Sequence, residues 1–195
     1  ATARVAASPA DGYTLLMAVS GDTVLPALHA KLPYDLERDL APVSLVTIGP
    51  YLLVVHPSVP ARNASDLIAL ARSQPGKLNY GSAGVGGGVH LAGELFKLMA
   101  KVNIVHVPYK GGSADSVLAV AVGQIDISFP NITAALPLLE ARKIRSLAVT
   151  SARRASLMPS IPTLDESGLP GYDRSTWYGL LAPAGVPKDI IARLH

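Results

Sequence analysis

The strongest constraint on the fold is a regular alternation of short apolar runs and amphipathic segments between residues 51 and 150. The runs are of strand length, and the segments between them have the length and spacing of helices. The predicted strands are 51–56, 78–81, 104–107, 125–129 and 144–150, and the predicted helices are 65–73, 89–100, 113–122 and 134–142. Strands that alternate with helices in this way need crossover connections. The pattern therefore predicts an α/β fold with a mainly parallel sheet, covered by helices on both faces.

Side-chain spacing also predicts how individual helices are capped and buried. In helix 65–73, Ser65 is the expected N-cap. In helix 89–100, one apolar stripe is expected to face the core, formed by Leu91, Ala92, Leu95, Leu98 and Met99.

The segments that flank this region lack the alternation. Further strands are predicted at 14–19, 42–47 and 177–181, whereas 151–175 is rich in turn residues. We therefore assign residues 1–50 and 176–195 to a partial outer lobe, and residues 51–175 to an inserted, complete α/β lobe. Two crossings between the lobes, near residues 50 and 175, would form a two-strand hinge. Both ends interrupt a regular pattern and no signal peptide is visible, so we expect a truncated form of a longer protein.

Composition excludes several classes of function. The 195 residues are 49% hydrophobic and 16% charged, and the net charge of +3 is too small and too scattered for nucleic-acid binding. Cysteine is absent, which excludes thiol catalysis, iron–sulfur clusters and cysteine-based zinc sites. The 5 histidines show no metal-binding spacing. We expect neither a metal nor a cofactor.

The most informative motif is a glycine-rich stretch between the strand at 78–81 and the helix at 89–100. Such a loop at the carboxyl end of a strand can direct backbone N–H groups and a helix N-terminus toward an anion. Neither the dinucleotide fingerprint, the P-loop nor the nucleophile elbow fits the spacing. The sequence favours an anion-binding loop over a plain linker, and its candidate residues are Ser82, Ala83, Gly84, Val85, Gly86, Gly87, Gly88 and the following His90.

Two further strand-end loops are expected at the same edge of the sheet. Tyr109 lies in the first, before Lys110, Gly111 and Gly112, and could offer its hydroxyl. In the second, Asn131 or Thr133 is expected to cap the next helix. Together the three loops would form one wall of a binding cleft.

Several segments, taken together, resemble the extracytoplasmic solute-binding receptors of tripartite tricarboxylate transporters, the TctC-like Bug family. The matching segments are DGYTLL (11–16), KLPYD (31–35), LVVHPS (53–58), PGKLNYGS (75–82), HLAGELF (90–96), VHVPYKGG (105–112), LAVT (147–150) and WYGLLAPAG (177–185). The resemblance covers essentially the whole chain. At one position the chain departs from the family, because Pro130 stands where an acidic residue is common.

This resemblance implies a two-lobed, type II periplasmic-binding-protein fold that closes on a small carboxylic acid. It also implies a periplasmic location, membrane transporter subunits as partners, and no catalysis. In such receptors, main-chain groups and ordered waters at strand–helix loops hold the carboxylate. The residues that match are the loop from Ser82 to Gly88, with Tyr109 and Asn131 as candidates on neighbouring loops.

Two alternatives remain open at the level of sequence. One is a small α/β hydrolase or transferase with Ser82 as nucleophile and His90 as base. The other is a truncated, non-binding module that self-associates through unpaired strand edges of its incomplete lobe.

Overall fold

The computed structural model describes residues 1–110 and 112–195. Gly111, named above in the loop after residue 108, lies outside the described residues. The chain divides into two compact units. One comprises Ala1–Ile48 with Thr176–His195, and the other comprises Gly49–Ser175.

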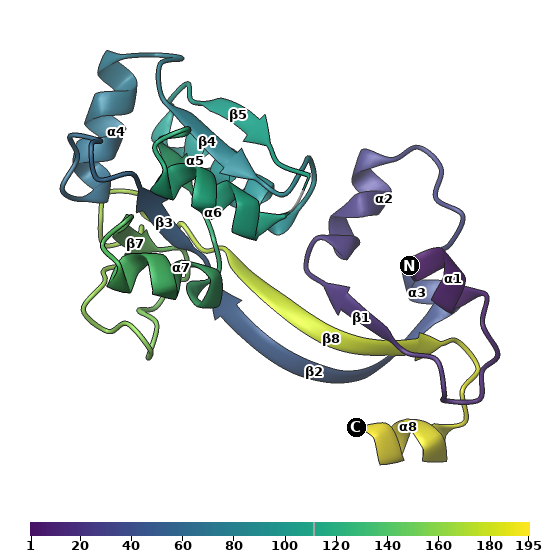
Figure 1. Ribbon diagram of the computed structural model, residues 1–195. Coiled ribbons are helices and arrows are strands. Elements are labelled where there is room, and N and C mark those ends of the chain that lie inside the picture. The colour runs from purple at the N-terminus through teal and green to yellow at the C-terminus, as the bar shows by residue number, and fades with distance from the viewer. Residues whose placement is uncertain (111) are drawn as a thin grey trace. The chain divides into compact units, whose positions relative to one another are not determined.

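Figure 1 shows the unit formed by Gly49–Ser175, with its strands β3, β4, β5 and β7 labelled. The unit is built on a five-stranded sheet with the order β5-β4-β6-β3-β7. Its elements are β3 (Leu52–Val55), α4 (Ala64–Ser73), β4 (Asn79–Ser82), α5 (Gly88–Ala100), β5 (Val105–Pro108), α6 (Ser113–Ala121), β6 (Ile127–Ser128), α7 (Ile132–Glu140) and β7 (Arg145–Val149). Strand β4 runs parallel to β5 and β6, whereas β3 is antiparallel to both β6 and β7. The predicted α/β fold with a mainly parallel sheet is confirmed, and β3 is the reversed strand.

Helices cover both faces of this sheet, as predicted, and β3 shows why. Its four residues are fully buried, and successive side chains point to opposite faces. Leu53 and Val55 join the core that includes residues of α4 and α5. Leu52 and Val54 join the core that includes residues of α6 and α7. A strand buried on both faces must be apolar throughout, which explains the continuous run in the sequence.

Two local predictions are wrong. The side chain of Asn63, rather than Ser65, caps α4 by accepting the N–H of Asp66, and the Ser65 hydroxyl instead donates to the Ser167 carbonyl. The buried face of α5 is also rotated from the predicted stripe, because Leu98 is 74% exposed. The residues of α5 that are buried are Val89, Ala92, Gly93, Phe96 and Ala100.

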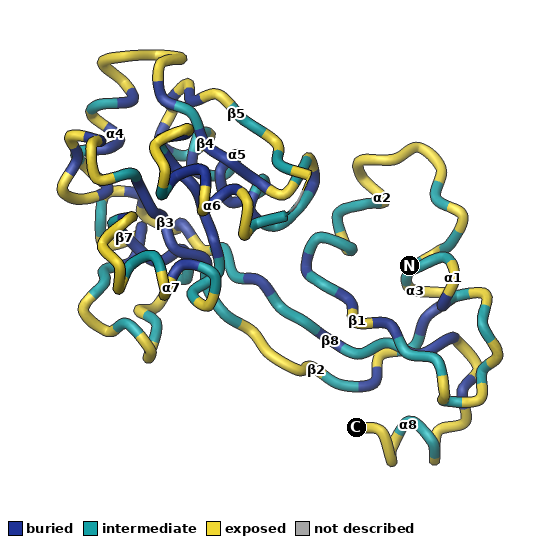
Figure 2. The backbone as a smooth tube through the Cα atoms, in the orientation of Figure 1, coloured by how far each residue is buried: buried dark blue, intermediate teal, exposed yellow. Residues whose placement is uncertain are grey.

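The unit formed by the two ends of the chain contains a three-stranded sheet with the order β1-β8-β2. Its strands are β1 (Leu16–Val19), β2 (Leu40–Pro50) and β8 (Ser175–Pro183), and its helices are α1 (Thr2–Ala6), η1 (Asp22–Val24), α2 (Leu25–Leu28), α3 (Leu36–Asp39) and α8 (Lys188–Leu194). Strands β1 and β8 pair antiparallel. Strand β2 lies at the edge of the sheet, and part of it is exposed (Figure 2). Its exposed residues include Leu45, Val46 and Ile48.

Candidate functional site

Three loops lie side by side at the end of the five-stranded sheet where β4, β5 and β6 terminate. Because β4, β5 and β6 are parallel neighbours, their carboxyl ends lie side by side. The backbone N–H of Tyr109 donates to the carbonyl of Ser82 over 2.8 Å, which ties the second loop to the end of β4. Asn131 follows β6 and forms a β-bridge with Tyr51. The structure therefore brings the loops that carry Ser82, Tyr109 and Asn131 to one edge.

The glycine loop, which we define as residues 83–87, requires glycine at two positions. Gly84 has a φ of +116° and Gly86 a φ of +83°, in the left-handed region that side chains disfavour. Space is not the constraint at Gly84, because an added Cβ there would meet nothing within 4 Å. Ala83 and Val85 are exposed, and they alternate along the loop with these two glycines.

The loop leads directly into α5, whose first turn is uncapped. Gly87 is the N-cap residue, and no side chain among the described residues caps the helix. The N–H groups of Gly88, Val89 and His90 have no carbonyl four residues earlier within the helix. Together with the positive end of the 13-residue helix, they form a set of donors suited to an anion.

Ser82 ends β4 fully buried, and its partner is a histidine that the sequence did not single out. Its Oγ lies 2.6 Å from Nε2 of His106, which is on the neighbouring strand β5. The same Oγ accepts the N–H of Gly84 over 3.1 Å. The sequence paired Ser82 with His90, and the structure instead pairs it with His106. The parallel register explains this, because His106 lies beside Tyr80, two residues before Ser82 on the same face.

His90 contacts the glycine loop at Gly86. Its Nδ1 accepts the N–H of Gly86 over 3.3 Å, and its ring centroid lies 4.4 Å from that of His106. Burial lowers the pKa of His90 below its ordinary value of 6.5. Burial also lowers the pKa of His106, and the charge of a protonated His90 would lower it further. Both rings are therefore neutral at pH 7.

A hydrogen-bonded cluster of Tyr80, Glu94 and Lys97 lies next to His106. Both the Tyr80 hydroxyl and Nζ of Lys97 donate to Oε1 of Glu94 over 2.7 Å. Burial raises the pKa of Tyr80, and the hydrogen bond to Glu94 adds to this effect. Burial also acts to raise the pKa of Glu94, but the hydrogen bonds from Lys97 and Tyr80 outweigh it and lower that pKa. Sequence analysis missed Tyr80 and Lys97; the spacing of Glu94 and Lys97 by three helical positions was the available signal.

The two remaining candidates have structural roles of their own. Asn131 caps α7, since its Oδ1 accepts the N–H of Ala134 over 2.8 Å. The prediction that Asn131 or Thr133 caps this helix is thus confirmed for Asn131, while Thr133 donates its hydroxyl to the Asn131 side chain. Tyr109 is partly buried and packs against the core beside α6.

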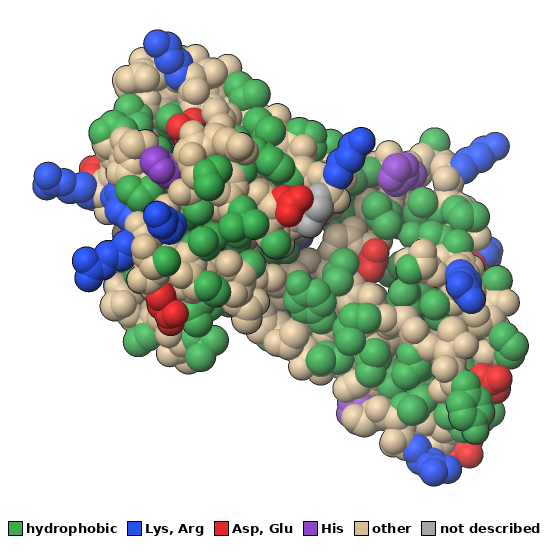
Figure 3. All heavy atoms as spheres, viewed as in Figure 1, with side chains coloured by type: hydrophobic (Ala, Val, Ile, Leu, Met, Phe, Trp, Pro, Cys, Tyr) green, Lys and Arg blue, Asp and Glu red, His purple; other side chains and the backbone are tan. Residues whose placement is uncertain are grey.

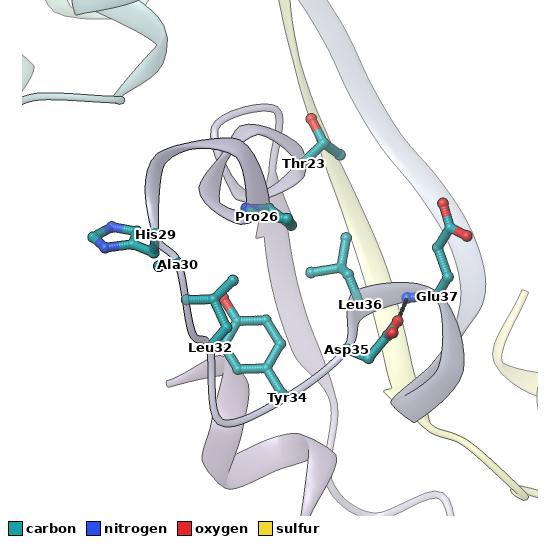
Figure 4. A pocket seen from close by; sticks show the side chains of 9 residues that line it. All are labelled: Thr23, Pro26, His29, Ala30, Leu32, Tyr34, Asp35, Leu36 and Glu37. Carbon is teal, nitrogen blue, oxygen red and sulfur yellow. Dashed lines mark hydrogen bonds between the residues drawn. The ribbon is translucent and has the colours of Figure 1, made fainter.

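A pocket in the other unit is chemically different (Figure 4). It encloses roughly 440 Å³ and is lined by Thr23, Pro26, His29, Ala30, Leu32, Tyr34, Asp35, Leu36 and Glu37. Oδ1 of Asp35 accepts the N–H groups of Glu37 and Arg38, so this carboxylate is occupied as a helix cap. The lining contains Asp35 and Glu37 but neither Lys nor Arg, so its charge favours an organic acid less than the glycine loop does.

Other classes of site have little support in residues 1–110 and 112–195. Within these ranges no group of three or more His, Asp or Glu side chains is arranged to hold a metal ion. No helix described here is long and apolar enough to cross a membrane. On the face shown in Figure 3, Lys and Arg side chains are scattered rather than gathered into a stripe.

The family described as tripartite tricarboxylate transporter family receptor, TctC, matches residues 1–195. The chain belongs to this family. The chain is 38% identical to a UPF0065 protein from the tcbD-tcbE intergenic region of Pseudomonas sp. (strain P51). The 192 matched residues cover 98% of this chain and 57% of that protein.

Solved structures of TctC-type proteins are similar over nearly the whole chain. R. palustris Rpa4515 with adipate is 38% identical with a TM-score of 0.89, and the match covers 99% of this chain and 64% of that one. MatC from Rhodopseudomonas palustris with bound malate is 32% identical with a TM-score of 0.88, covering 99% and 66%. These matches confirm the periplasmic-binding-protein type of α/β fold.

The chain spans somewhat more than half the length of the curated relatives that it matches. Its family and its solved relatives are solute-binding receptors rather than enzymes. This finding contradicts the alternative of a hydrolase or transferase that uses Ser82 and His90. The hydrogen bonding agrees, because the buried Ser82 hydroxyl contacts His106 rather than His90.

Proposed function

We propose that this chain is the part of a solute receptor that grips one carboxylate group of a small organic acid. The binding groups are the backbone N–H groups of Ala83, Val85 and Gly87 and of the first turn of α5, because those of Gly84 and Gly86 donate within the protein. The observation that carries the proposal is the uncapped N-terminus of α5, joined to a loop with two left-handed glycines at the carboxyl edge of β4. The adipate and malate bound by the relatives support a carboxylate as the ligand.

Neutral donors suit this task because they need no counter-charge when the ligand leaves. A carboxylate at a helix N-terminus gains about 0.3–1 kcal/mol from the helix dipole at an exposed site, and more when partly buried. Glu94 lies in the second turn of α5 and would oppose an anion, but Lys97 and Tyr80 both donate to its carboxylate. The positive charge of Lys97 thus offsets the negative charge of Glu94.

Two strands of this chain connect its two units. The chain passes between its two units within β2 and again at the start of β8. We propose that these two strands serve as the hinge of a closing receptor, with residues 83–88, Tyr109 and Asn131 on one wall of its cleft. By family membership, the receptor would act in the periplasm and deliver its ligand to a tripartite tricarboxylate transporter.

Nuclear magnetic resonance titration of this chain with adipate and with malate tests the proposal and detects weak binding. We expect saturable amide shifts concentrated in residues 83–90, and no shifts with the uncharged diamide of adipic acid. Gly84→Val should weaken binding at least tenfold, because the loop needs a left-handed residue there while the added side chain meets open space.

Gly171→Val is the matched control for this variant. Gly171 also has a positive φ of +80° and nothing within 4 Å of an added Cβ, but it lies in the turn-rich segment 151–175. Binding by Gly171→Val should equal that of the parent chain. Unchanged binding by Gly84→Val, or the absence of shifts with every acid, would refute the loop as the carboxylate site.

A further inference from the structure

We propose that neutral His90 and His106 are the positioning residues of the glycine loop, and that protonation of this pair loosens the loop and weakens carboxylate binding. The second half of this inference rests on the proposed function, whereas the first half concerns the loop alone. The two histidines come from different elements, since His90 lies in the first turn of α5 and His106 on β5.

Two backbone N–H groups of the glycine loop donate hydrogen bonds to side chains of the protein. The N–H of Gly86 donates to Nδ1 of His90, and the N–H of Gly84 donates to Oγ of Ser82. These two glycines are also the left-handed residues of the loop. The inward bonds therefore fix the part of the backbone that has most conformational freedom. They also set the direction of the neighbouring N–H groups that are available to a ligand.

The bond to Gly86 exists only while His90 is neutral at Nδ1. An imidazole nitrogen accepts a hydrogen bond when it carries no proton and becomes a donor when it is protonated. Protonation at Nδ1 would place two N–H donors against each other across the 3.3 Å between Gly86 and His90. The loop would have to move away from the ring.

His106 acts on the loop through Ser82. With Nε2 unprotonated, the ring accepts the Ser82 hydroxyl over 2.6 Å, and the oxygen keeps its lone pairs for Gly84. With Nε2 protonated, the ring becomes the donor, and the hydroxyl must turn toward another acceptor. The carbonyl of Gly84, 3.2 Å from Oγ, is that acceptor. A proton on Nε2 thus reverses the hydrogen bond between His106 and Ser82 and turns the Ser82 hydroxyl toward the carbonyl of Gly84.

The surroundings keep the pair neutral at pH 7. The charged groups that act on both rings are Glu94 and Lys97 of α5, and the Tyr80 ring of β4 stacks 4.9 Å from that of His106. Glu94 would favour protonation of the histidines, but its carboxylate already accepts from Lys97 and from Tyr80. Because the two rings lie 4.4 Å apart, a proton on one opposes a proton on the other.

A charge on either ring would also attract the ligand's carboxylate, which opposes the effect of loosening. We expect loosening to dominate because protonation directly replaces an attractive contact at Gly86 by a repulsive one. The two effects have opposite signs in a binding experiment, so the measurement separates them.

The loop is tested first without any ligand. In a titration from pH 8 to pH 5, the amide resonances of Gly84 and Gly86 should shift with the same midpoints as the side chains of His90 and His106. His90→Leu, which removes the acceptor, should speed amide exchange at Gly86 at least tenfold. His90→Asn supplies a non-titrating oxygen near the position of Nδ1 and should restore protection.

His56→Gln is the control for the loss of a histidine, since His56 follows β3 at the opposite edge of the sheet and bonds to Ser58. It should leave the titration of both glycines unchanged. Glycine resonances that do not follow the two histidines, or equal amide exchange in the Leu and Asn variants, would overturn the positioning role.

Binding of malate is then compared at pH 7.5 and pH 5.5. The reference is the double variant His90→Asn, His106→Gln, which experiences the same ionisation of malate. The parent chain should lose more affinity than this variant over that pH range. Coincident pH profiles, or a relative gain by the parent, would overturn the inference. Failure of the parent to bind malate and adipate at pH 7.5 would refute the proposed function, while the ligand-free titration would still decide the positioning role.

Discussion

The contact between α5 and β4 beneath the site predicts a large effect of a single methyl group. Gly93 lies against the ring of Tyr80, and a Cβ built at Gly93 would lie 2.2 Å from Cε2 and 2.7 Å from Cδ2 and Cζ of that ring. Tyr80 is fully buried, and its hydroxyl donates to Glu94. The ring therefore cannot turn aside without losing packing or that hydrogen bond.

The expected free-energy change for Gly93→Ala combines two opposing effects. Inserting a methyl group into a packed core costs about 1–3 kcal/mol, and the rigid ring places this site at the upper end. Replacing glycine by alanine inside a helix returns about 1 kcal/mol. We expect a net destabilisation of about 2 kcal/mol, which lowers the urea midpoint by about 1 M for a slope of about 2 kcal/mol per M.

Urea unfolding, followed by far-ultraviolet circular dichroism and by amide exchange of β3, measures this loss in the unit that contains α5. Gly49→Ala is the control, because it has an ordinary φ and nothing within 4 Å of an added Cβ. It should unfold at the parent's urea concentration. A Gly93→Ala chain as stable as the parent, or more stable, would show that the Tyr80 ring is not held against α5 as described.

Three further outcomes are expected. Asn131→Ala should destabilise the chain by about 1 kcal/mol through loss of the α7 cap, whereas Thr133→Ala, which removes an exposed hydroxyl, should have little effect in the same urea titration. Ser82→Ala should cost about 1–3 kcal/mol, because it leaves buried donors and acceptors without their partner, and a cost near zero would contradict the hydrogen bonds to its Oγ. Because the pKa values of His90 and His106 are lowered in the folded chain, the unfolded chain binds more protons below pH 6.5. Stability should therefore fall as the pH drops from 6.5 toward the folded pKa values, and a flat profile from pH 7.5 to 5 would contradict these directions.

The sequence predicted the fold well where a local pattern carries the signal. The apolar runs and the amphipathic segments between them were sufficient to locate the strands and helices of the five-stranded unit. Prediction failed where two elements had to be docked. The α5 stripe was placed around Leu98, but the core selects the face with Gly93 and Phe96, because only a residue without a side chain fits against the Tyr80 ring.

The candidate site likewise combines local features with contacts that depend on the tertiary structure. The glycine loop, the helix that follows it and a cap by Asn131 or Thr133 are local features, so the sequence alone predicted them. The hydrogen bond between Ser82 and His106 depends on the register of two parallel strands that are 24 residues apart in sequence. Only the tertiary structure decides which histidine reaches the serine, because a shift of one residue would turn His106 to the opposite face of the sheet.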